Sequence, residues 1–578
     1  MEAASHTIFD PLPARGAVIA THTAPAMEKD VLARLREAEA GAEAASRLAE
    51  NPQALSFLAG AFTLSPYLRD CALIEPKNLV LLLSAAFDAQ AQALVVETAT
   101  AWRQAEGEAV LMTALRRAKR RIALCLGLAD LGGWMPPEQV TRQLSLFAGA
   151  ALQSAVSFLL RGMHEAGRIA LPDPQEPAAD SGLVVLGMGK FGAFELNYSS
   201  DIDIILFFDA ECPALRQCDD PTSLFVRLAK QLSKIMQERT GDGYVFRTDL
   251  RLRPDPGSTP LAIPVETALN YYAAYGQNWE RAAFIKARAV AGDIAAGENF
   301  LRELVPFVWR KYLDFAAIQD VHSIKRQIHA HKGHGEIAVK GHNIKLGRGG
   351  IREVEFFVQT QQLIAGGRRE PLRVRSTIDG LAALEADDWI TAEARATLSR
   401  AYWFLRRVEH CIQMVSDEQS HTLPEDDAGL ARIAAMMGYE TAAAFTEALT
   451  ATMRQVEHIY AELFESAPQL SGQGGNLVFT GDDEDPATVE TLARIGFKRP
   501  SQIISAIKAW HYGRYPAVRS SQAREMLTEL TPQLLETFSQ TTDPDHAFTG
   551  FDRFLQGLPA GIQFFGILMA NPKLTRLL

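Results

Sequence analysis

The chain is short of cysteine, of excess positive charge and of uninterrupted apolar runs. It has only 5 cysteines in 578 residues, and no two of them form a Cys-x-x-Cys pair. This pattern argues against a disulfide framework or a structural zinc site and fits a reducing compartment. The formal net charge of −11 gives no electrostatic footprint for nucleic acid or for an anionic membrane surface. We therefore expect no nucleic-acid partner and no membrane partner.

No targeting segment or membrane span is expected either. The N-terminal segment lacks the basic region and following apolar run that a secretory signal requires. No apolar stretch reaches the roughly 18 residues that span a bilayer. A hydrophobic fraction of 47% is ordinary for a globular protein, which excludes a disordered chain. The composition predicts a soluble cytoplasmic protein with several domains.

Two kinds of hydrophobic spacing alternate along the chain. From residue 28 to about 168, apolar residues recur three and four apart, which predicts helices. Short β-branched and aromatic runs at 183–186 and 202–208 predict buried strands. Helical spacing returns at 224–239, and 244–253 alternates like a further strand. The predicted fold class is α+β, predominantly α-helical, with a small sheet domain embedded between helical domains.

Changes in composition divide the chain into five segments. A connector with three prolines at 171–180 and a Gly-, Ser- and Asp-rich stretch at 467–486 interrupt the helical pattern. The predicted segments are a helical N-terminal region (1–175), a sheet domain (176–300), a helical bundle domain that completes the site (301–466), a linker (467–486) and a helical region (487–578).

A glycine-rich turn follows the first predicted strand. Gly187, Gly189 and Gly192 match G-x-G-x-x-G, the pattern of dinucleotide-binding folds. Those folds need a full crossover helix before the next strand, whereas here the strand at 202–208 follows after a few residues. A P-loop is also excluded, because the residue after Lys190 is neither serine nor threonine.

A pair of aspartates on the second predicted strand suggests a metal site. Asp201 and Asp203 are two residues apart, so their carboxylates project from the same face and repel unless a cation lies between them. Mg²⁺ suits such oxygen ligands and leaves positions for phosphate oxygens. Asp249 supplies a third ligand if its strand is a neighbour, while Lys190 and the glycine turn offer positive charge to a phosphate chain. The alternative is a structural turn followed by two solvated aspartates; the order of the motifs favours the metal site.

Three sequence blocks carry a resemblance to a known family. They are LGMGKFGAFELNYSSDID (186–203), FRTDLRLRP (246–254) and KLGRGGIREVEFFVQ (345–359). In this order they resemble the signature of the bifunctional glutamine synthetase adenylyltransferase/adenylyl-removing enzymes, members of the nucleotidyltransferase superfamily with a DNA polymerase β-like fold. The resemblance implies that 176–300 is the nucleotidyltransferase catalytic domain.

The resemblance implies a Mg²⁺-dependent site in which Asp201, Asp203 and Asp249 are catalytic and hold the metal. Eleven further residues are candidates for binding phosphate or nucleotide: Gly187, Gly189, Lys190, Ser200, Arg251, Arg253, Gly349, Gly350, Arg352, Glu353 and Glu355. For the two arginines at 251 and 253, surface ion pairs are the alternative interpretation. For the two glycines at 349–350, the alternative is a tight turn without a bound anion.

The resemblance also implies an activity. Members of the family contain two such catalytic units: the first removes AMP from a tyrosine of glutamine synthetase by phosphorolysis, releasing ADP, and the second adds AMP from ATP. Both are governed by the signal protein PII and by glutamine. One metal motif occurs here, in the first half, so the chain resembles the AMP-removing unit, and 487–578 resembles the start of a truncated second half. The alternatives are ATP-dependent adenylylation at the same site, or a non-catalytic platform that binds PII and glutamine synthetase.

Two further clusters have structural explanations that we favour. Five histidines between His322 and His342 suggest zinc binding, but the surrounding glycines and lysines are more typical of a basic loop. Tyr271, Tyr275 and Trp279 suggest an adenine platform, but helix packing accounts for them. None of the 13 histidines precedes an aspartate, so the His-Asp dipeptide of the related PII-uridylylating enzymes is missing.

Overall fold

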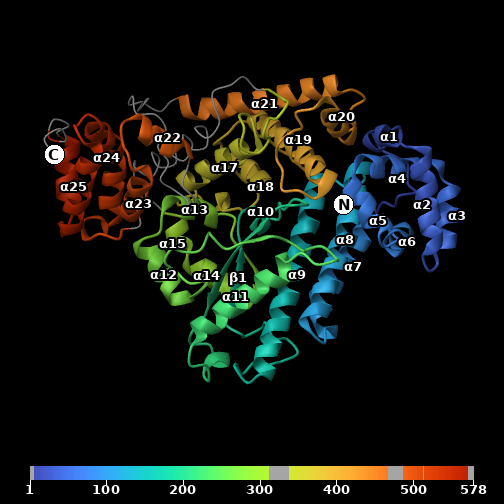
Figure 1. Cartoon of the computed structure of the whole chain (residues 1–578), viewed down its shortest axis with the longest axis horizontal. Helices are drawn as coiled ribbons and strands as arrows, with labels where there is room; N and C mark the ends of the chain where they lie inside the picture. Colours follow the sequence, from blue (N-terminus) through green and yellow to red (C-terminus); the bar gives the residue numbers. More distant parts are fainter. Residues whose placement is uncertain (1–4, 311–337, 466–485, 512, 571–573, 575–578) are drawn as a thin grey trace.

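A computed structural model describes residues 5–310, 338–465, 486–511, 513–570 and 574. Most of these residues are helical, and a small mixed sheet of five strands lies between helical regions (Figure 1). This arrangement confirms the predicted fold class.

Helices occupy most of the chain before the sheet. Side chains cap two of them: Asn51 accepts the N–H of Ala54 at the start of α4, and Ser65 accepts the N–H of Leu68 at the start of α5. The helices are α1 (Ala14–Ala20), α2 (Pro25–Glu37), α3 (Gly41–Ala49), α4 (Pro52–Leu64), α5 (Pro66–Leu73), α6 (Lys77–Ser84), α7 (Phe87–Thr100), η1 (Ala101–Gln104), α8 (Glu108–Gly132) and α9 (Pro137–Glu165).

The sheet is built around its second strand. The strands are β1 (Leu183–Gly187), β2 (Ile202–Phe208), β3 (Thr248–Asp249), β4 (Ala262–Pro264) and β5 (Arg288–Gly292). β1 pairs antiparallel with β2 and β5, while β3 and β4 pair parallel with successive parts of β2. All five residues of β1 and six of the seven of β2 are buried, as expected for continuous apolar runs. The two strands predicted at 183–186 and 202–208 are thus confirmed.

Helices flank the strands and separate them along the chain. α9 packs against β5 and α14 against β1. The helix predicted at 224–239 is α11, which begins three residues earlier, after an Asp220 cap, and ends two residues earlier. The elements from the sheet to residue 310 are α10 (Gly189–Gly192), η2 (Pro213–Leu215), α11 (Pro221–Gln237), α12 (Val265–Ala274), α13 (Asn278–Phe284), α14 (Ile294–Glu303) and α15 (Val305–Val308).

From residue 338 onward, the described elements are helices joined by loops. They are α17 (Ile351–Ala365), η3 (Glu370–Leu372), α18 (Thr377–Ala386), α19 (Ala392–Ser416), α20 (Asp427–Met436), α21 (Ala442–Glu465), α22 (Pro486–Arg494), α23 (Pro500–His511), η4 (Pro516–Val518), α24 (Ser521–Ser539), α25 (Pro544–Gly557) and α26 (Ile562–Ala570).

The long strand predicted at 244–253 is wrong: only Thr248 and Asp249 form a strand. Val245 and Phe246 are consecutive yet both buried, so the segment does not alternate between two faces. Directly after β3 the chain turns, because the Asp249 carboxylate accepts the backbone N–H of Arg251 at 2.8 Å. The alternating residues of 244–253 therefore include one short strand, followed by a turn that the Asp249 side chain stabilises.

Helix α9 is long and apolar enough, by length and composition alone, to cross a membrane. Polar residues interrupt its apolar runs, so no membrane span is predicted there from uninterrupted apolar residues. In the structure 72% of its most apolar window is buried, and it packs against α7, α11 and β5. In the described fold α9 is therefore a core helix.

The buried apolar residues form two clusters. One runs from Ile8 to Tyr460 and the other from Leu492 to Leu568. The first includes residues of all three segments predicted before residue 467, so their boundaries stay predictions. Residues 467–485 of the predicted linker lie outside the described residues.

The remaining predictions can be placed only in part. Of the five crowded histidines, His342 alone lies within the described residues. Tyr271 contacts the rings of Tyr272 and Tyr275, and its hydroxyl donates to Glu280 at 3.3 Å, which is the packing expected of these aromatics. All five cysteines are free thiols.

Candidate active site

The glycine turn joins β1 to the short helix α10. Gly189 has a positive φ of 51°, and a Cβ built on it would lie 3.2 Å from Asp203 Oδ2. A Cβ on Gly192 would lie 2.0 Å from the carbonyl oxygen of Lys286, so only glycine permits this close packing. The turn is therefore held tightly against the strand that carries Asp203.

Three carboxylates gather where β2 begins; we call Asp201, Asp203 and Asp249 the carboxylate edge. The parallel register pairs Asp203 directly with Asp249, and Asp201 immediately precedes β2. Burial, followed by the charges of Asp249 and Asp201, raises the pKa of Asp203 to about 7. The three carboxylates predicted on β2 and its sheet neighbour thus lie at one edge of the sheet.

Two members of the carboxylate edge are engaged by other side chains. Asp201 Oδ1 accepts Arg247 Nε and its Oδ2 accepts Gln419 Nε2, each at 2.8 Å. Arg251 Nη2 donates to Asp249 Oδ2 at 2.7 Å, and this contact holds the pKa of Asp249 below its usual range despite partial burial. Among the described residues, no group of three or more His, Cys, Asp or Glu side chains is already arranged around one metal position.

The chemistry of the carboxylate edge nevertheless fits a hard divalent cation. Carboxylate oxygens are the ligands that Mg²⁺ prefers, and mutual repulsion at Asp203 is what a cation between the carboxylates would relieve. The space beside Gly189 is kept open by the lack of a side chain. Asp201, Asp203 and Asp249 therefore offer carboxylate oxygens of the kind a divalent cation takes, at one edge of the sheet.

Arg251 and Arg253 lie on the loop after β3 with different roles. Arg251 is 59% exposed and its guanidinium lies on Asp249, at the solvent side of the site. Arg253 donates to the backbone carbonyls of Leu250, Pro256 and Thr259, and so holds the turn. Ser200 is buried next to Asp201. Arg251 thus presents its guanidinium directly to a carboxylate of the edge.

The block at 345–359 contains the start of α17. Gly349 has φ 72°, its Cβ would lie 2.3 Å from the Met453 carbonyl oxygen, and its N–H is accepted by Glu353 at 3.0 Å. Gly350 is the N-cap residue, and Arg352 reaches Glu355 at 3.7 Å. The Glu353 carboxylate thus occupies the Gly349 N–H, one of the groups that an anion would use.

Behind the glycine turn lies a set of shielded charges that we call the buried ion cluster. Lys190 donates to Glu409 at 3.0 Å, and Lys286 donates to Glu195 at 2.6 Å and lies 4.0 Å from Glu355. Burial alone would raise the pKa of Glu355, but Lys286 and then Lys190 lower it to about 2. The cluster consists of Lys190, Glu195, Lys286, Glu355, Arg406 and Glu409.

Several of these contacts were not predicted from the sequence. Glu409, Arg406 and Gln419 reach the site from more than 200 residues away along the chain. They lie on α19 or just after it, in a helix whose pattern shows only that it is partly buried. Glu195 and Arg247 lie inside the blocks 186–203 and 246–254. The family resemblance of these blocks was therefore the signal that could have identified the two residues.

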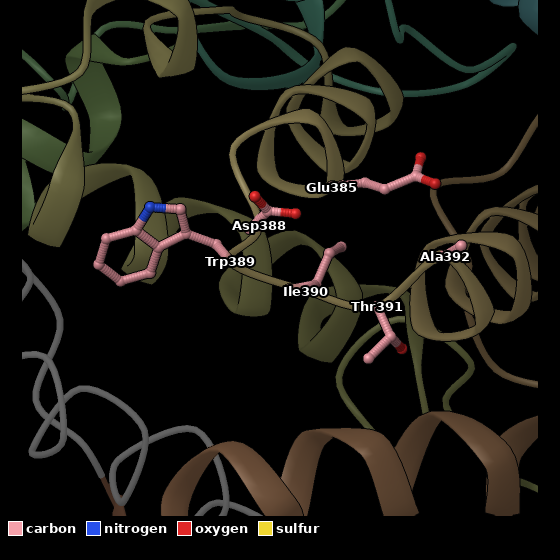
Figure 2. Close-up of a pocket in the computed structure, with 6 residues that line it drawn as sticks. All are labelled: Glu385, Asp388, Trp389, Ile390, Thr391 and Ala392. Atoms are coloured by element: carbon pink, nitrogen blue, oxygen red, sulfur yellow. The ribbon is translucent and has the colours of Figure 1, made fainter.

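One open cavity of about 460 Å³ lies apart from these charges. Figure 2 shows its lining on the connection between α18 and α19, with Trp389 and Asp388 at the surface. It shares no residue with the carboxylate edge or the buried ion cluster. Its lining residues are Glu385, Asp388, Trp389, Ile390, Thr391 and Ala392.

Comparison with known proteins adds a family to this geometry. Residues 55–303 match the family model described as glutamate-ammonia ligase adenylyltransferase, and residues 322–464 match that of GlnD PII-uridylyltransferase. The first matched region includes the whole carboxylate edge and the glycine turn.

Curated relatives match nearly the whole chain. The bifunctional glutamine synthetase adenylyltransferase/adenylyl-removing enzyme of Mesorhizobium japonicum is 57% identical over 95% of this chain and 56% of its own length. The enzymes of the same name from Rhizobium meliloti and Brucella melitensis are 56% and 54% identical, over 95% and 96% of this chain and 56% of their own lengths. The chain spans about half the length of the curated relatives it matches. It belongs to the glutamate-ammonia ligase adenylyltransferase family of nucleotidyltransferases.

Proposed function

We propose that this chain removes AMP from an adenylylated tyrosine of glutamine synthetase by Mg²⁺-dependent phosphorolysis and releases ADP. The observation that carries the proposal is the register that pairs Asp203 with Asp249, with Asp201 just before β2; burial, and then the neighbouring anions, raise the pKa of Asp203. The name shared by the relatives supports glutamine synthetase as the substrate. The sequence resemblance of the metal motif favours removal of AMP over its addition.

The reaction exchanges one phosphorus–oxygen bond for another. An oxygen of orthophosphate attacks the phosphorus of the AMP–tyrosine ester, the bond to the tyrosine oxygen breaks, and the phenolate takes up a proton. Its parent pKa of about 10 makes the phenolate an acceptable leaving group when nearby charge stabilises it. Mg²⁺, when held by Asp201, Asp203 and Asp249, supplies neutralisation of phosphate charge.

The chain's own cations supply the rest of the site. Arg251 lies at the solvent side, where entering orthophosphate meets it first, and Arg247 orients Asp201. Lys190 adds a positive charge at the glycine turn. Together these groups would position both phosphates and offset their repulsion, which is the main requirement of phosphoryl and nucleotidyl transfer.

Adenylylation with ATP is the second candidate, because the relatives' name includes both activities and one metal site serves both directions. A direct assay separates the two. Purified chain is incubated with AMP-labelled glutamine synthetase, orthophosphate and Mg²⁺, and separately with unmodified glutamine synthetase and ATP. ADP formation in the first mixture is expected; AMP incorporation in the second, without ADP formation in the first, would reverse the assignment.

Asp203→Asn tests the site itself. The variant should lose at least about a thousandfold in ADP release, because removing a group that stabilises charge in the transition state costs several kcal/mol. Asp388→Asn is a matched control: Asp388 is exposed and has a positive φ of 58°, a conformation that asparagine accepts. Equal activity of Asp203→Asn and the control would remove Asp203 from the site, and a chain inactive in both mixtures would favour a non-catalytic platform.

The signal protein PII is the proposed regulatory partner, and the cytoplasm the proposed compartment. The match of residues 322–464 to the PII-uridylyltransferase model supports a surface suited to PII. Titration of the chain with PII, with and without glutamine, should show saturable binding; no binding under either condition would exclude this partner for the chain.

A further inference from the structure

Glu409 lies at the centre of the buried ion cluster, directly behind the glycine turn. Its side chain is fully buried on α19. Its carboxylate oxygens accept Lys190 Nζ at 3.0 and 3.3 Å. Arg406 Nε lies 3.3 Å from the same carboxylate and His421 Nδ1 lies 2.7 Å from it. One carboxylate thus links cationic or titratable groups from α10, from α19 and from the segment after α19.

The position of Lys190 is unfavourable without this carboxylate. Burial lowers the pKa of Lys190 to about 8, Arg406 and Lys345 lower it as well, and Glu409 and Glu355 act in the opposite direction. Glu409 is the one that touches the ammonium. Its own pKa is held well below the usual range by Lys190, His421, Arg406 and Lys345, although burial opposes this. The pair is therefore charged in the interior only because each partner supports the other.

α19 also grips the backbone that follows the glycine turn. Arg406, fully buried, donates to the carbonyl of Glu195 and to the side chain of Asn197. Gln413, two turns further on, accepts the N–H of Ser199 at 2.9 Å. The helix that carries Glu409 is thus fixed relative to the loop that leads from the glycine turn into β2, so the position of Lys190 is set by α19 and not by the glycine turn alone.

We propose that Glu409 is a positioning residue that acts through Lys190, keeping its ammonium charged and fixed beside the glycine turn so that it binds a nucleotide phosphate. This inference rests on the proposed nucleotidyltransferase site but concerns nucleotide binding and not the direction of the reaction. Glu409 need not touch the nucleotide, since its effect passes through the Lys190 side chain.

The test is the pH profile of ADP binding to the full chain in the presence of Mg²⁺, measured by titration calorimetry. Wild type should bind up to about pH 8 and weaken above it. In Glu409→Gln, the anion that touches the ammonium is gone and only the more weakly acting Glu355 still opposes burial and the charges of Arg406 and Lys345, so the alkaline limb should move down by about one pH unit or more. Glu409→Asp keeps a carboxylate and should restore part of the range. A merely structural role would weaken binding equally at every pH.

Substitutions of Lys190 provide a second test of the proposal. Arginine stays protonated throughout this range, so Lys190→Arg should extend binding to higher pH and should also cancel the shift caused by Glu409→Gln. In a Lys190→Met background, Glu409→Gln should cost nothing further. An unchanged pH profile in Glu409→Gln, or a further loss in the Lys190→Met background, would overturn the proposal. If Glu409→Gln does not fold, as judged by circular dichroism, an unshifted limb in Lys190→Arg overturns it.

The proposed function fails by a different result. A wild-type chain that binds ADP with this pH dependence, yet forms no ADP from AMP-labelled glutamine synthetase, would refute the reaction and leave the role of Glu409 standing.

Discussion

The carboxylate edge and the buried ion cluster flank the same glycine turn but are built in opposite ways. At the edge, the paired side chains of Asp201, Arg247 and Arg251 are 29%, 28% and 59% exposed. In the cluster, Lys286 and Glu195 are 6% and 4% exposed, and Glu409 is fully buried. The edge meets solvent and the cluster does not.

This difference in exposure suits the two regions to different roles. Ion pairs of exposed side chains are worth about 0–1 kcal/mol, so the exposed Arg251 can leave its carboxylate when a metal or phosphate arrives. A buried pair that loses one partner costs about 3–5 kcal/mol, because the other charge is left without compensation. The cluster is therefore suited to fix the turn and to hold Lys190 in place beside it, and the more exposed Arg251 to exchange partners when a ligand binds.

The largest effect on stability should come from Lys286→Met. It leaves the buried carboxylates of Glu195 and Glu355 without their shared cation and should lower the free energy of unfolding by about 3–5 kcal/mol. The measurement is denaturant unfolding followed by circular dichroism. The control is Lys340→Met, which breaks an exposed pair with Asp427 and should cost less than about 1 kcal/mol. Similar losses in the two variants would erase the distinction between the regions.

A smaller effect should appear in acid. Since the pKa of Glu355 falls to about 2 in the folded protein, its ionised form contributes stability above its usual pKa of 4.5, and this contribution is lost as pH falls toward 2. The contribution is of the order of 3 kcal/mol. The stability difference between wild type and Glu355→Gln should therefore shrink between pH 5 and pH 2. Glu393→Gln, at an exposed position in the first turn of α19, is the control, and a constant difference for Glu355→Gln would contradict the assignment.

The smallest effect should be that of Arg251→Met, and it should fall on function. The KM for orthophosphate should rise about tenfold, corresponding to about 1.4 kcal/mol, while unfolding changes by less than about 1 kcal/mol. Steady-state ADP formation at varied orthophosphate measures this. Arg395→Met is the control: it removes a surface ion pair with Glu385 and should change neither the KM for orthophosphate nor the free energy of unfolding. A loss of stability without a change in KM would make Arg251 a structural residue.

The sequence allowed the local parts of the site to be predicted. Continuous apolar runs identify β1 and β2, and the spacing of Asp201 and Asp203 places their carboxylates together at the start of β2. The partnership of Asp203 with Asp249 depends on a parallel register, which the sequence could only suggest. Its supposed support, an alternating strand from 244 to 253, proved to be two residues of strand and a turn.

The contacts that come from far along the chain were beyond such reasoning. Glu409 and Gln419 meet Lys190 and Asp201 only because α19 packs beside the sheet, and hydrophobic periodicity does not specify which helix faces which strand. In the same way, a buried lysine such as Lys286 reads as a surface residue until its two carboxylate partners are placed beside it.

The brevity of β3 has a consequence for how the protein would fail. Its two residues attach the third carboxylate through a few backbone hydrogen bonds, one of them from the Ile202 N–H to the Arg247 carbonyl oxygen at 2.9 Å. Such a segment opens locally at far lower cost than the buried helices around it. Amide hydrogen exchange should thus be fast at 247–249 and slow in β2, and under mild denaturation the chain would lose the third carboxylate of the edge while its helices remain intact.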